Sequence, residues 1–308
     1  MSWLESNGKM MSVLAAGATL CGVGAFGPTV RATLVAYEGF NYTAGITLPA
    51  DRNPTTWNGG TGWSNTWNTA NGDEPVIGTG SLSYGTLATT GNMMTVPNAN
   101  STGNGAERTL DSTAQSDFIY GGSATGTMWV SALVQQNYTG DNAAISLGNT
   151  QQYQPGITFG SFTSGGVSYY GMASNTTNVA TAPVVTGTAA FLVLEINFTG
   201  NNNIDLTLYV DPAPGLTAPA AGTTSITYSG KPFSSSGGVN VTGTGWSFDE
   251  LRFGTTYADV APSIPEPATL ALMAAAGTGI LLRPRKRAGK DQHPHGTGPA
   301  GRDEEGPK

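Results

Sequence analysis

The chain has 308 residues and a formal net charge of −7 at pH 7, yet only 11% of its residues are charged, against roughly 25% in typical soluble domains. Hydrophobic residues make up 38% and glycine supplies 44 positions, which is enough for a core and unlike a disordered chain. Between residues 33 and 265 the basic residues are Arg52, Arg108, Lys231 and Arg252 alone. The body therefore lacks the basic face that a nucleic-acid partner requires.

Cysteine and histidine are nearly absent. The single cysteine, Cys21, lies in an N-terminal apolar stretch, and both histidines, His293 and His295, lie in the extreme tail. The body can therefore form no internal disulfide. Ser-His-Asp and Cys-His catalysis and histidine-ligated zinc are excluded for the same reason.

Residues 1–32 are predicted to be a secretory signal peptide. Lys9 precedes the apolar run MMSVLAAGATLCGVGAFG, and Val30-Arg31-Ala32 has small residues at the −3 and −1 positions of a cleavage site after Ala32. A positive segment, an apolar segment and such a site are the parts of a secretory signal. The alternative, a buried helix, does not suit the β-rich sequence that follows.

Three tryptophans open the body. Trp57, Trp63 and Trp67, with Tyr42 nearby, form the densest aromatic cluster of the chain. Their faces could stack on sugar rings, with neighbouring Asn and Thr bonding the hydroxyls, or they could fill the edge of the core. We prefer the core interpretation and keep the three as candidate carbohydrate-facing residues.

Several stretches farther along have the pattern of strands. Thr127–Val134 is rich in β-branched and aromatic residues, as strands are. The Gly-rich segment Thr163–Gly166 predicts a turn, so the strands on either side of it are expected to form a hairpin. Trp246–Gly254 is a further strand, with its alternation interrupted at Asp249-Glu250, which predicts a bulge.

The clearest strands are Phe191–Phe198 and Ile204–Val210, in which apolar and polar residues alternate. Alternation with a period of two predicts an antiparallel hairpin with one buried and one wet face. The residues expected to face inward are Leu192, Leu194, Ile196, Phe198, Ile204, Leu206, Leu208 and Val210. Many short strands with Gly-rich turns predict a sandwich or barrel.

Four segments of the chain together resemble a group of exported bacterial proteins that are similar to concanavalin A-like and laminin-G-like domains. They are LVAYEGFNYTAG, WNGGTGWSNTWN, FLVLEINFTGNNNIDLTLYVDP and FDELRFGTTYADVAP. The resemblance implies that residues 33–262 form an all-β, antiparallel jelly-roll β-sandwich of the concanavalin A-like kind. It is a pattern of strands and carries no site motif.

No pair of carboxylates has the spacing of a glycosidase. Jelly-roll glycoside hydrolases of the laminarinase type carry two or three carboxylates at alternate positions of one strand, so that they reach the same sugar. Here Glu195 has Asn197 at its alternate position, and Asp249 and Glu250 are adjacent. We therefore expect no catalytic residues, although carboxylates that are distant in the sequence could still lie close together in the folded protein.

No cofactor is expected. Calcium is the one ion that such a sandwich could hold, through Asp side chains and backbone carbonyls. The candidate positions are Asp141-Asn142, Asp205 and Asp211-Pro212. Asp residues that simply form turns are the more common explanation of such positions.

The C-terminus carries three signals in order. Pro265-Glu266-Pro267 is followed by an uncharged apolar run of 15 residues, 268–282, and by a basic cluster. As a helix the run would be about 22 Å long, short of a bilayer core of about 30 Å. The basic cluster should stay on the cytoplasmic side; it consists of Arg283, Arg285, Lys286 and Arg287.

This order of signals, over residues 263–287, resembles the PEP-CTERM sorting segment of Gram-negative bacteria. The resemblance implies recognition of Pro265-Glu266-Pro267 by an exosortase, a transient membrane anchor at 268–282, and delivery to the cell envelope or extracellular matrix. An ordinary tail anchor is the alternative. Residues 288–308 continue past the basic cluster, unlike the family, and their composition predicts disorder.

The sequence as a whole predicts an exported, exosortase-sorted, non-catalytic structural or adhesive protein that contacts polysaccharide. The alternative is a carbohydrate-active enzyme, a glycoside hydrolase, on the same fold.

Overall fold

The computed structural model describes residues 34–48, 57–69, 75–97, 105–118, 125–139, 142–148, 156–174, 177–200, 203–220, 222–229 and 237–264. The predicted signal peptide, the tripeptide at 265–267, the apolar run at 268–282 and the tail at 288–308 lie outside these residues. The chain separates into two units, Met1–Pro262 and Ser263–Lys308. Among the described residues no helix is long and apolar enough to cross a membrane.

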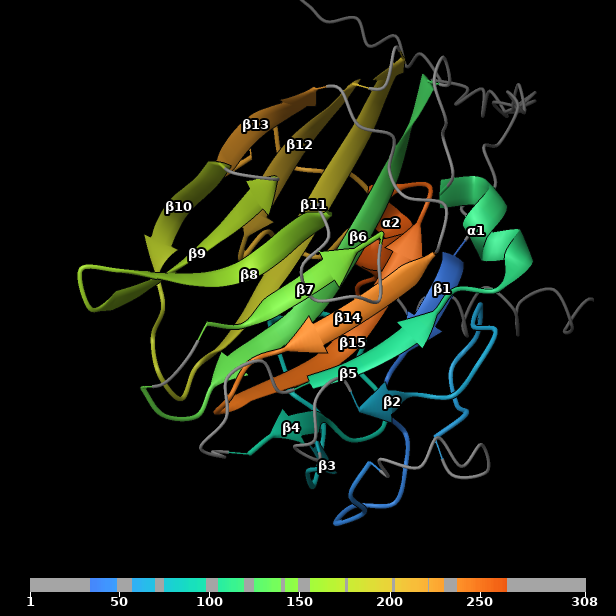
Figure 1. The fold of residues 1–308 in the computed structure, drawn as a ribbon, viewed down its shortest axis with the longest axis vertical. Helices are drawn as coiled ribbons and strands as arrows, with labels where there is room; N and C mark the ends of the chain where they lie inside the picture. Colours follow the sequence, from blue (N-terminus) through green and yellow to red (C-terminus); the bar gives the residue numbers. More distant parts are fainter. Residues whose placement is uncertain are drawn as a thin grey trace, which may run out of the picture. The chain divides into compact units, whose positions relative to one another are not determined.

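Two antiparallel sheets form a sandwich (Figure 1), which confirms the predicted all-β class. One sheet has eight strands: β13 (Thr224–Ser229), β12 (Asn203–Val210), β11 (Ala189–Gly200), β6 (Thr125–Gln136), β15 (Trp246–Gly254), β4 (Met94–Val96) and β3 (Val76–Ile77) in this order, with β1 (Leu34–Glu38) paired to β15. The other has seven, in the order β10 (Thr177–Pro183), β9 (Val167–Ser174), β8 (Ile157–Ser164), β7 (Ala144–Leu147), β14 (Gly238–Thr242), β5 (Gly105–Thr109) and β2 (Asn68–Thr69).

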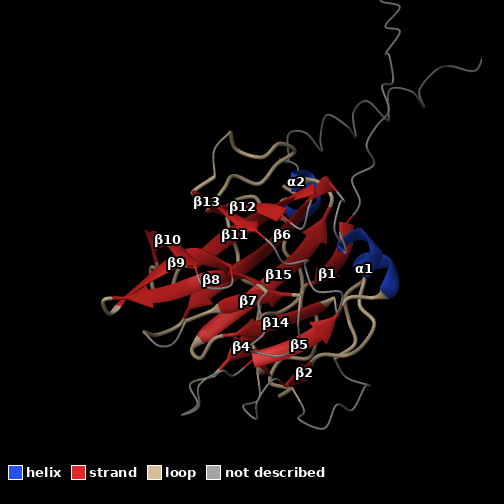
Figure 2. Ribbon diagram, turned by 45° about the horizontal axis from the view of Figure 1, so that its top comes forward, coloured by secondary structure: helices blue, strands red, loops and turns tan. Residues whose placement is uncertain are grey.

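Two short helices complete the described fold (Figure 2). They are α1 (Ser112–Phe118), which follows β5, and α2 (Tyr257–Val260), which follows β15. Thr256 caps α2, since its side chain and that of Asp259 each accept from the other residue's backbone N–H. Such a reciprocal capping box satisfies two N–H groups that a helix start leaves free.

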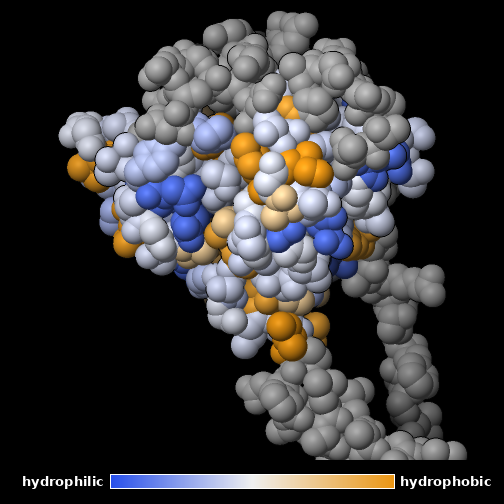
Figure 3. Space-filling model, turned by 90° about the horizontal axis from the view of Figure 1, so that it is seen from below, coloured by the Kyte–Doolittle hydropathy of each residue, from blue (hydrophilic) through white to orange (hydrophobic). Residues whose placement is uncertain are grey.

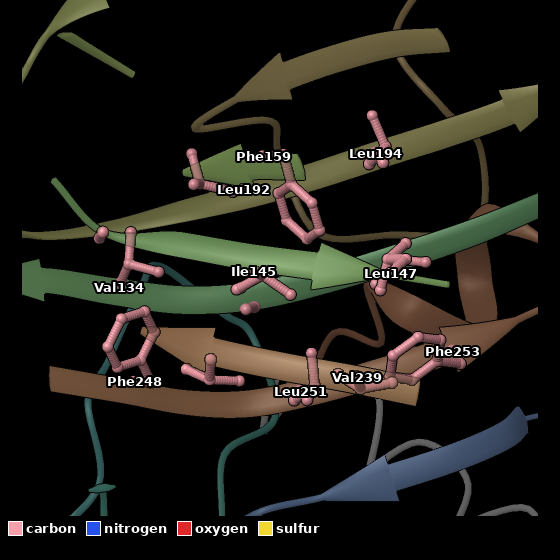
Figure 4. Packing of buried hydrophobic residues seen from close by; sticks show 14 of the residues in the cluster. Val134, Ile145, Leu147, Phe159, Leu192, Leu194, Val239, Phe248, Leu251 and Phe253 are labelled. Atoms are coloured by element: carbon pink, nitrogen blue, oxygen red, sulfur yellow. The ribbon is translucent and has the colours of Figure 1, made fainter. Parts of the chain in front are cut away.

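The core lies between the facing sheets. Figure 4 shows side chains of β7, β8 and β14 pointing toward those of β6, β11 and β15. Phe159 and Leu194 have 0% exposure, and Ile145 and Val239 have 1%. Removing this apolar surface from water is the main term that stabilises the sandwich.

The predicted alternation of β11 and β12 is confirmed. Seven of the eight residues expected to face inward are at most 3% exposed, and Val210 is half-buried against the same core. Cross-strand partners such as Leu194 and Leu208 lie directly opposite each other. Glu195 and Asn197, at the alternate positions, are half-buried and exposed.

The opposite face of the eight-stranded sheet is not wet along its whole length, contrary to the prediction for this hairpin. Phe191 and Val193 on β11 are both 0% exposed and pack in a second hydrophobic cluster. Segments distant in sequence supply the rest of the cluster: Leu82, Leu87, Trp129, Leu133, Tyr209, Tyr257, Val260 and Ala261. A short-range pattern cannot show that a loop and α2 cover this face.

The predicted bulge in β15 is confirmed. Its register against β6 shifts between Asp249 and Arg252, and Glu250 has a φ of 53°. This left-handed conformation is uncommon for a residue other than glycine. β15 lies inside the sheet, with β6 on one side and β4 and β1 on the other, and all nine of its residues are buried.

The predicted hairpin at Thr163–Gly166 is also confirmed, as β8 and β9. Gly165 and Gly166 form its turn with φ of 61° and 80°. Both values are in the region that glycine reaches without steric cost, and two such residues in succession suit a tight hairpin turn.

Candidate functional site

A buried ion pair joins β1 to β5. Arg108 Nη1 donates to Glu38 Oε2 at 2.6 Å, and each side chain is 1% exposed. Arg108 also donates to the carbonyl oxygens of Asn65 and Gly59, at 2.7 and 2.8 Å. Burial lowers the pKa of Arg108, while the Glu38 charge opposes this shift. A buried charge with this many partners keeps a fixed position.

The three candidate tryptophans surround this pair. Trp67 Nε1 donates to Glu38 Oε2 at 2.8 Å, and Trp63 Nε1 donates to the carbonyl oxygen of Tyr37 at 3.0 Å. The guanidinium carbon of Arg108 is 5.0 Å from the ring centre of Trp63 and 5.9 Å from that of Trp67. Cations at such distances are attracted to the ring faces.

Trp57 and Trp67 are each 1% exposed, so a sugar ring has no access to their faces in this structure. Trp63 is half-buried against the core. Trp57 packs on Tyr42 with ring centres 4.9 Å apart, and the Tyr42 hydroxyl donates to Glu38 at 2.8 Å. The aromatic cluster therefore packs the segment 57–69 against the core, which is the interpretation that we preferred from the sequence. The alternative, that Trp57 and Trp67 face carbohydrate, does not fit their burial in this structure.

Asp249 and Glu250 perform a similar fastening role at the bulge. Asp249 accepts from the backbone N–H groups of Leu82 and Glu250, each at 2.8 Å, and lies 2.5 Å from Ser81 Oγ. Burial, with some contribution from the neighbouring Glu250 charge, raises the pKa of Asp249 to about 8. The Ser81 hydroxyl donates to Asp249 Oδ2, which lowers the pKa of Asp249 in opposition to burial, and it also lies 3.0 Å from the Leu82 carbonyl oxygen.

Glu250 binds the following part of the same loop. It accepts from the backbone N–H of Thr90 and from the Tyr37 hydroxyl, and forms an ion pair with Arg252. The two adjacent carboxylates thus hold the segment 81–90 against the sheet, where it covers the second cluster.

The remaining candidate carboxylates are spread over the fold. Glu195 accepts from the Tyr209 hydroxyl at 2.9 Å, and Asp211 accepts from the backbone N–H of Phe191 at 2.8 Å. Asp205 lies on β12 opposite Asn197. Asp141 lies outside the described residues, while Asn142 accepts from Thr163 at 2.8 Å. No group of three or more His, Cys, Asp or Glu that could hold a metal occurs among the residues that the structure describes.

The outer face of the seven-stranded sheet carries a different kind of arrangement. Directly paired residues of neighbouring strands have side chains on the same face. Following the register from β2 to β8 gives one row of five polar residues, here called the polar row: Asn68, Glu107, Asn240, Ser146 and Thr158. With strands about 4.8 Å apart, the row spans about 19 Å.

Two hydrogen bonds link members of the polar row, and its centre has an unused acceptor. Asn68 Nδ2 donates to Glu107 Oε1 at 3.2 Å, and the hydroxyls of Ser146 and Thr158 are 3.1 Å apart. Asn240, between them, is 3% exposed, and its Oδ1 has no hydrogen-bond partner. Asn240 is thus covered in this structure, whereas the other four members of the polar row are half-buried and partly open to solvent.

The next two rows on this face differ sharply in size. The row beside the polar row, two residues farther along the strands, consists of small residues: Thr242, Gly105, Ala144, Gly160 and Gly171. A Cβ built on Gly105 would come within 2.0 Å of the Val241 carbonyl oxygen, so no larger residue fits there. Beyond this flat strip, Phe162 and Tyr169 pair across β8 and β9 and are both half-buried.

The outer face therefore combines hydrogen-bonding groups, a strip without bulky side chains and an aromatic pair. Sequence reasoning missed it because the members of the polar row come from five strands between residues 68 and 240. Each strand shows only one or two polar residues at outward positions, which any solvent-facing strand would show. Figure 3 shows one side of the molecule, mostly pale, with hydrophobic residues in small separate groups.

The chain matches no family model and no curated protein. Solved structures with a similar arrangement include domain 4 of AbnA, an extracellular arabinanase from Geobacillus stearothermophilus, in complex with arabinotriose. It is 13% identical with a TM-score of 0.41, over 75% of this chain and 98% of that one. Trypanosoma rangeli sialidase is 9% identical with a TM-score of 0.39, and the match covers 74% of this chain and 32% of the sialidase chain. The Emp47p carbohydrate recognition domain is 10% identical with a TM-score of 0.34, and the match covers 70% of this chain and 96% of that domain's chain. Likenesses of this size assign no function to this chain.

Proposed function

We propose that this chain is a non-catalytic, exported protein whose jelly-roll sandwich contacts neutral polysaccharide through the outer face of its seven-stranded sheet. The observation that carries the proposal is the polar row, in which four members are half-buried and present amide, carboxylate and hydroxyl groups on one face: Asn68, Glu107, Ser146 and Thr158. Amide and hydroxyl groups suit sugar hydroxyls, and the half-buried ring of Tyr169 offers an apolar surface to a sugar ring on the same face.

The chemistry of the described carboxylates supports a binding role. On the outer face, Glu107 is the one carboxylate of the polar row, and its Oε1 accepts from Asn68. Retaining glycosidases use two carboxyl groups about 5–5.5 Å apart, and inverting ones a pair about 6.5–9.5 Å apart. Glu38, Asp249 and Glu250 are bound to Arg108, to backbone N–H groups and to Arg252, and they fasten loops.

A glycan array and a reducing-end assay on the full chain test this function. We expect binding of neutral glycans without turnover. Ser146→Ala removes a half-buried hydroxyl of the polar row and should weaken binding about 2- to 10-fold, the effect of one hydrogen bond of about 0.5–1.5 kcal/mol. The control Asn197→Ala changes an exposed residue of the other sheet and should leave affinity unchanged. Glycan cleavage that disappears in Glu107→Gln would establish the enzyme instead.

We also propose that the C-terminal segment sorts the protein to the envelope or matrix of a Gram-negative cell. Its support is the sequence order of Pro265-Glu266-Pro267, an apolar run and the cluster Arg283–Arg287. An exosortase-type enzyme would act on the tripeptide while the run 268–282 holds the chain briefly in the membrane, with the basic cluster resisting translocation.

Mass spectrometry of the protein recovered from the cell surface and medium checks the sorting proposal. We expect no peptide C-terminal to about residue 268, because processing near the tripeptide removes the rest. A variant with Glu266→Ala should accumulate in the membrane at full length. Released wild-type protein that still contains Arg302–Lys308 would contradict processing and leave a plain tail anchor.

A further inference from the structure

A cavity of about 390 Å³ opens at one end of the sandwich. Gln136, at the end of β6, lines it, and the β8–β9 hairpin provides Thr163, Gly166, Val167 and Ser168. Thr139 and, from the connection between β10 and β11, Val184 and Thr186 complete the described lining. The cavity thus lies where the chain crosses from one sheet to the other, apart from the polar row on the outer face.

The cavity is held in shape by backbone hydrogen bonds. The Val184 N–H donates to the Ser168 carbonyl oxygen at 2.9 Å, and the Gly187 N–H donates to the Gln136 carbonyl oxygen at 2.7 Å. These bonds tie the crossing connection to a strand of each sheet. Because both walls are fixed in this way, the cavity is already formed without a ligand, as most small-molecule sites are.

Gln136 continues the inward-facing row of β6 after Met128, Val130, Ala132 and Val134. A polar residue here interrupts the apolar core. It is 2% exposed, and its Oε1 accepts from Thr186 Oγ1 at 2.7 Å. Its Nε2 is buried and has no hydrogen-bond partner. An amide donor left unpaired in the interior is unfavourable, so an acceptor brought by a ligand would relieve it.

The lining restricts what that ligand can be. Apolar surface comes from Val167 and Val184, and hydroxyl and amide groups come from Gln136, Thr139, Thr163, Ser168 and Thr186. No charged side chain occurs among the described residues that line the cavity. A charged ligand would lose its hydration without gaining a partner, and an apolar one would leave Gln136 Nε2 unpaired. A neutral polyhydroxylated ring satisfies both kinds of surface.

We propose that this cavity is a second saccharide subsite, which takes one neutral sugar unit, with Gln136 Nε2 donating to an oxygen of that unit and Val167 and Val184 against its C–H face. The inference rests on the proposed contact with neutral polysaccharide and specifies it further. The β8–β9 hairpin carries residues of both sites, since Phe162 and Tyr169 face outward while Thr163 and Ser168 line the cavity.

The test measures binding of the full chain to xylohexaose, cellohexaose, laminarihexaose and mannohexaose by calorimetry, with oligogalacturonate as an anionic probe. Val167 is 46% exposed at the cavity mouth, and Val167→Arg adds a bulky charge there; Val185, 60% exposed and outside the cavity lining, gives the matched control Val185→Arg. We expect at least one neutral probe to bind, Val167→Arg to weaken it at least tenfold, and Val185→Arg to leave it unchanged.

A second variant, Gln136→Met, keeps the volume and removes the buried amide. We expect it to weaken the same probe about tenfold with little change in the melting temperature of the free protein, since removing the unpaired Nε2 offsets the loss of the hydrogen bond from Thr186 to Oε1. Loss on Ser146→Ala together with full affinity in Val167→Arg and Gln136→Met would overturn the subsite and leave the proposed function standing. Tighter binding of oligogalacturonate than of every neutral probe, or binding of no probe, would overturn both.

Discussion

Arg108→Met is expected to lower the free energy of unfolding by about 3–5 kcal/mol, because it leaves the Glu38 carboxylate as an uncompensated buried charge. Both side chains are 1% exposed, so water cannot replace the lost partner. The substitution also removes donors to the carbonyl oxygens of Asn65 and Gly59, which would free the segment 57–69 from β5. Urea denaturation followed by tryptophan fluorescence measures the change.

A double variant separates charge from packing. Glu38→Gln together with Arg108→Met removes both charges, so it should be more stable than Arg108→Met alone. Glu107→Gln is the matched control, because Glu107 is the next residue on β5 and is half-buried on the outer face; it should change stability by less than about 0.5 kcal/mol. A double variant whose loss equals the sum of the two single losses would contradict the ion-pair explanation.

Trp67→Ala is expected to cost about 3–5 kcal/mol of stability, the range for a large aromatic residue removed from a core. The side chain is 1% exposed, lies beside Phe40 and Trp63, and donates to Glu38. Its loss would leave a cavity next to the buried ion pair. Thermal unfolding monitored by circular dichroism measures the effect.

The matched comparison is Tyr169→Ala, on the outer face. Tyr169 pairs with Phe162 across the hairpin, and such pairs contribute up to about 1 kcal/mol, so stability should change by no more than that. Glycan affinity should fall in Tyr169→Ala and stay unchanged in the folded fraction of Trp67→Ala. A Trp67→Ala protein that is as stable as wild type but no longer binds glycan would restore the carbohydrate-facing interpretation of this tryptophan.

The amino-acid sequence determined the features that depend on short-range order. The strict alternation of β11 and β12 fixed which side chains face the core, because successive side chains of a strand point to opposite faces. The break at Asp249-Glu250 located the bulge, and the Gly-rich turn located the β8–β9 hairpin. The absence of histidine and cysteine between residues 33 and 262 excluded whole classes of catalytic site.

Only the tertiary structure decided what lies next to what across long sequence separations. In the sequence, Arg108 looks like an ordinary exposed arginine on a strand. In the structure it is buried between the sheets and paired with Glu38, which lies 70 residues away in the chain. Phe191 and Val193 are covered by segments that no local pattern connects to β11. The polar row exists because the register of five strands aligns single residues, and the cavity exists because Gln136 ends an otherwise apolar row beside the β10–β11 connection. Periodicity fixes the face of a side chain, whereas its neighbours depend on strand register and loop paths, which are set by contacts distant in the chain.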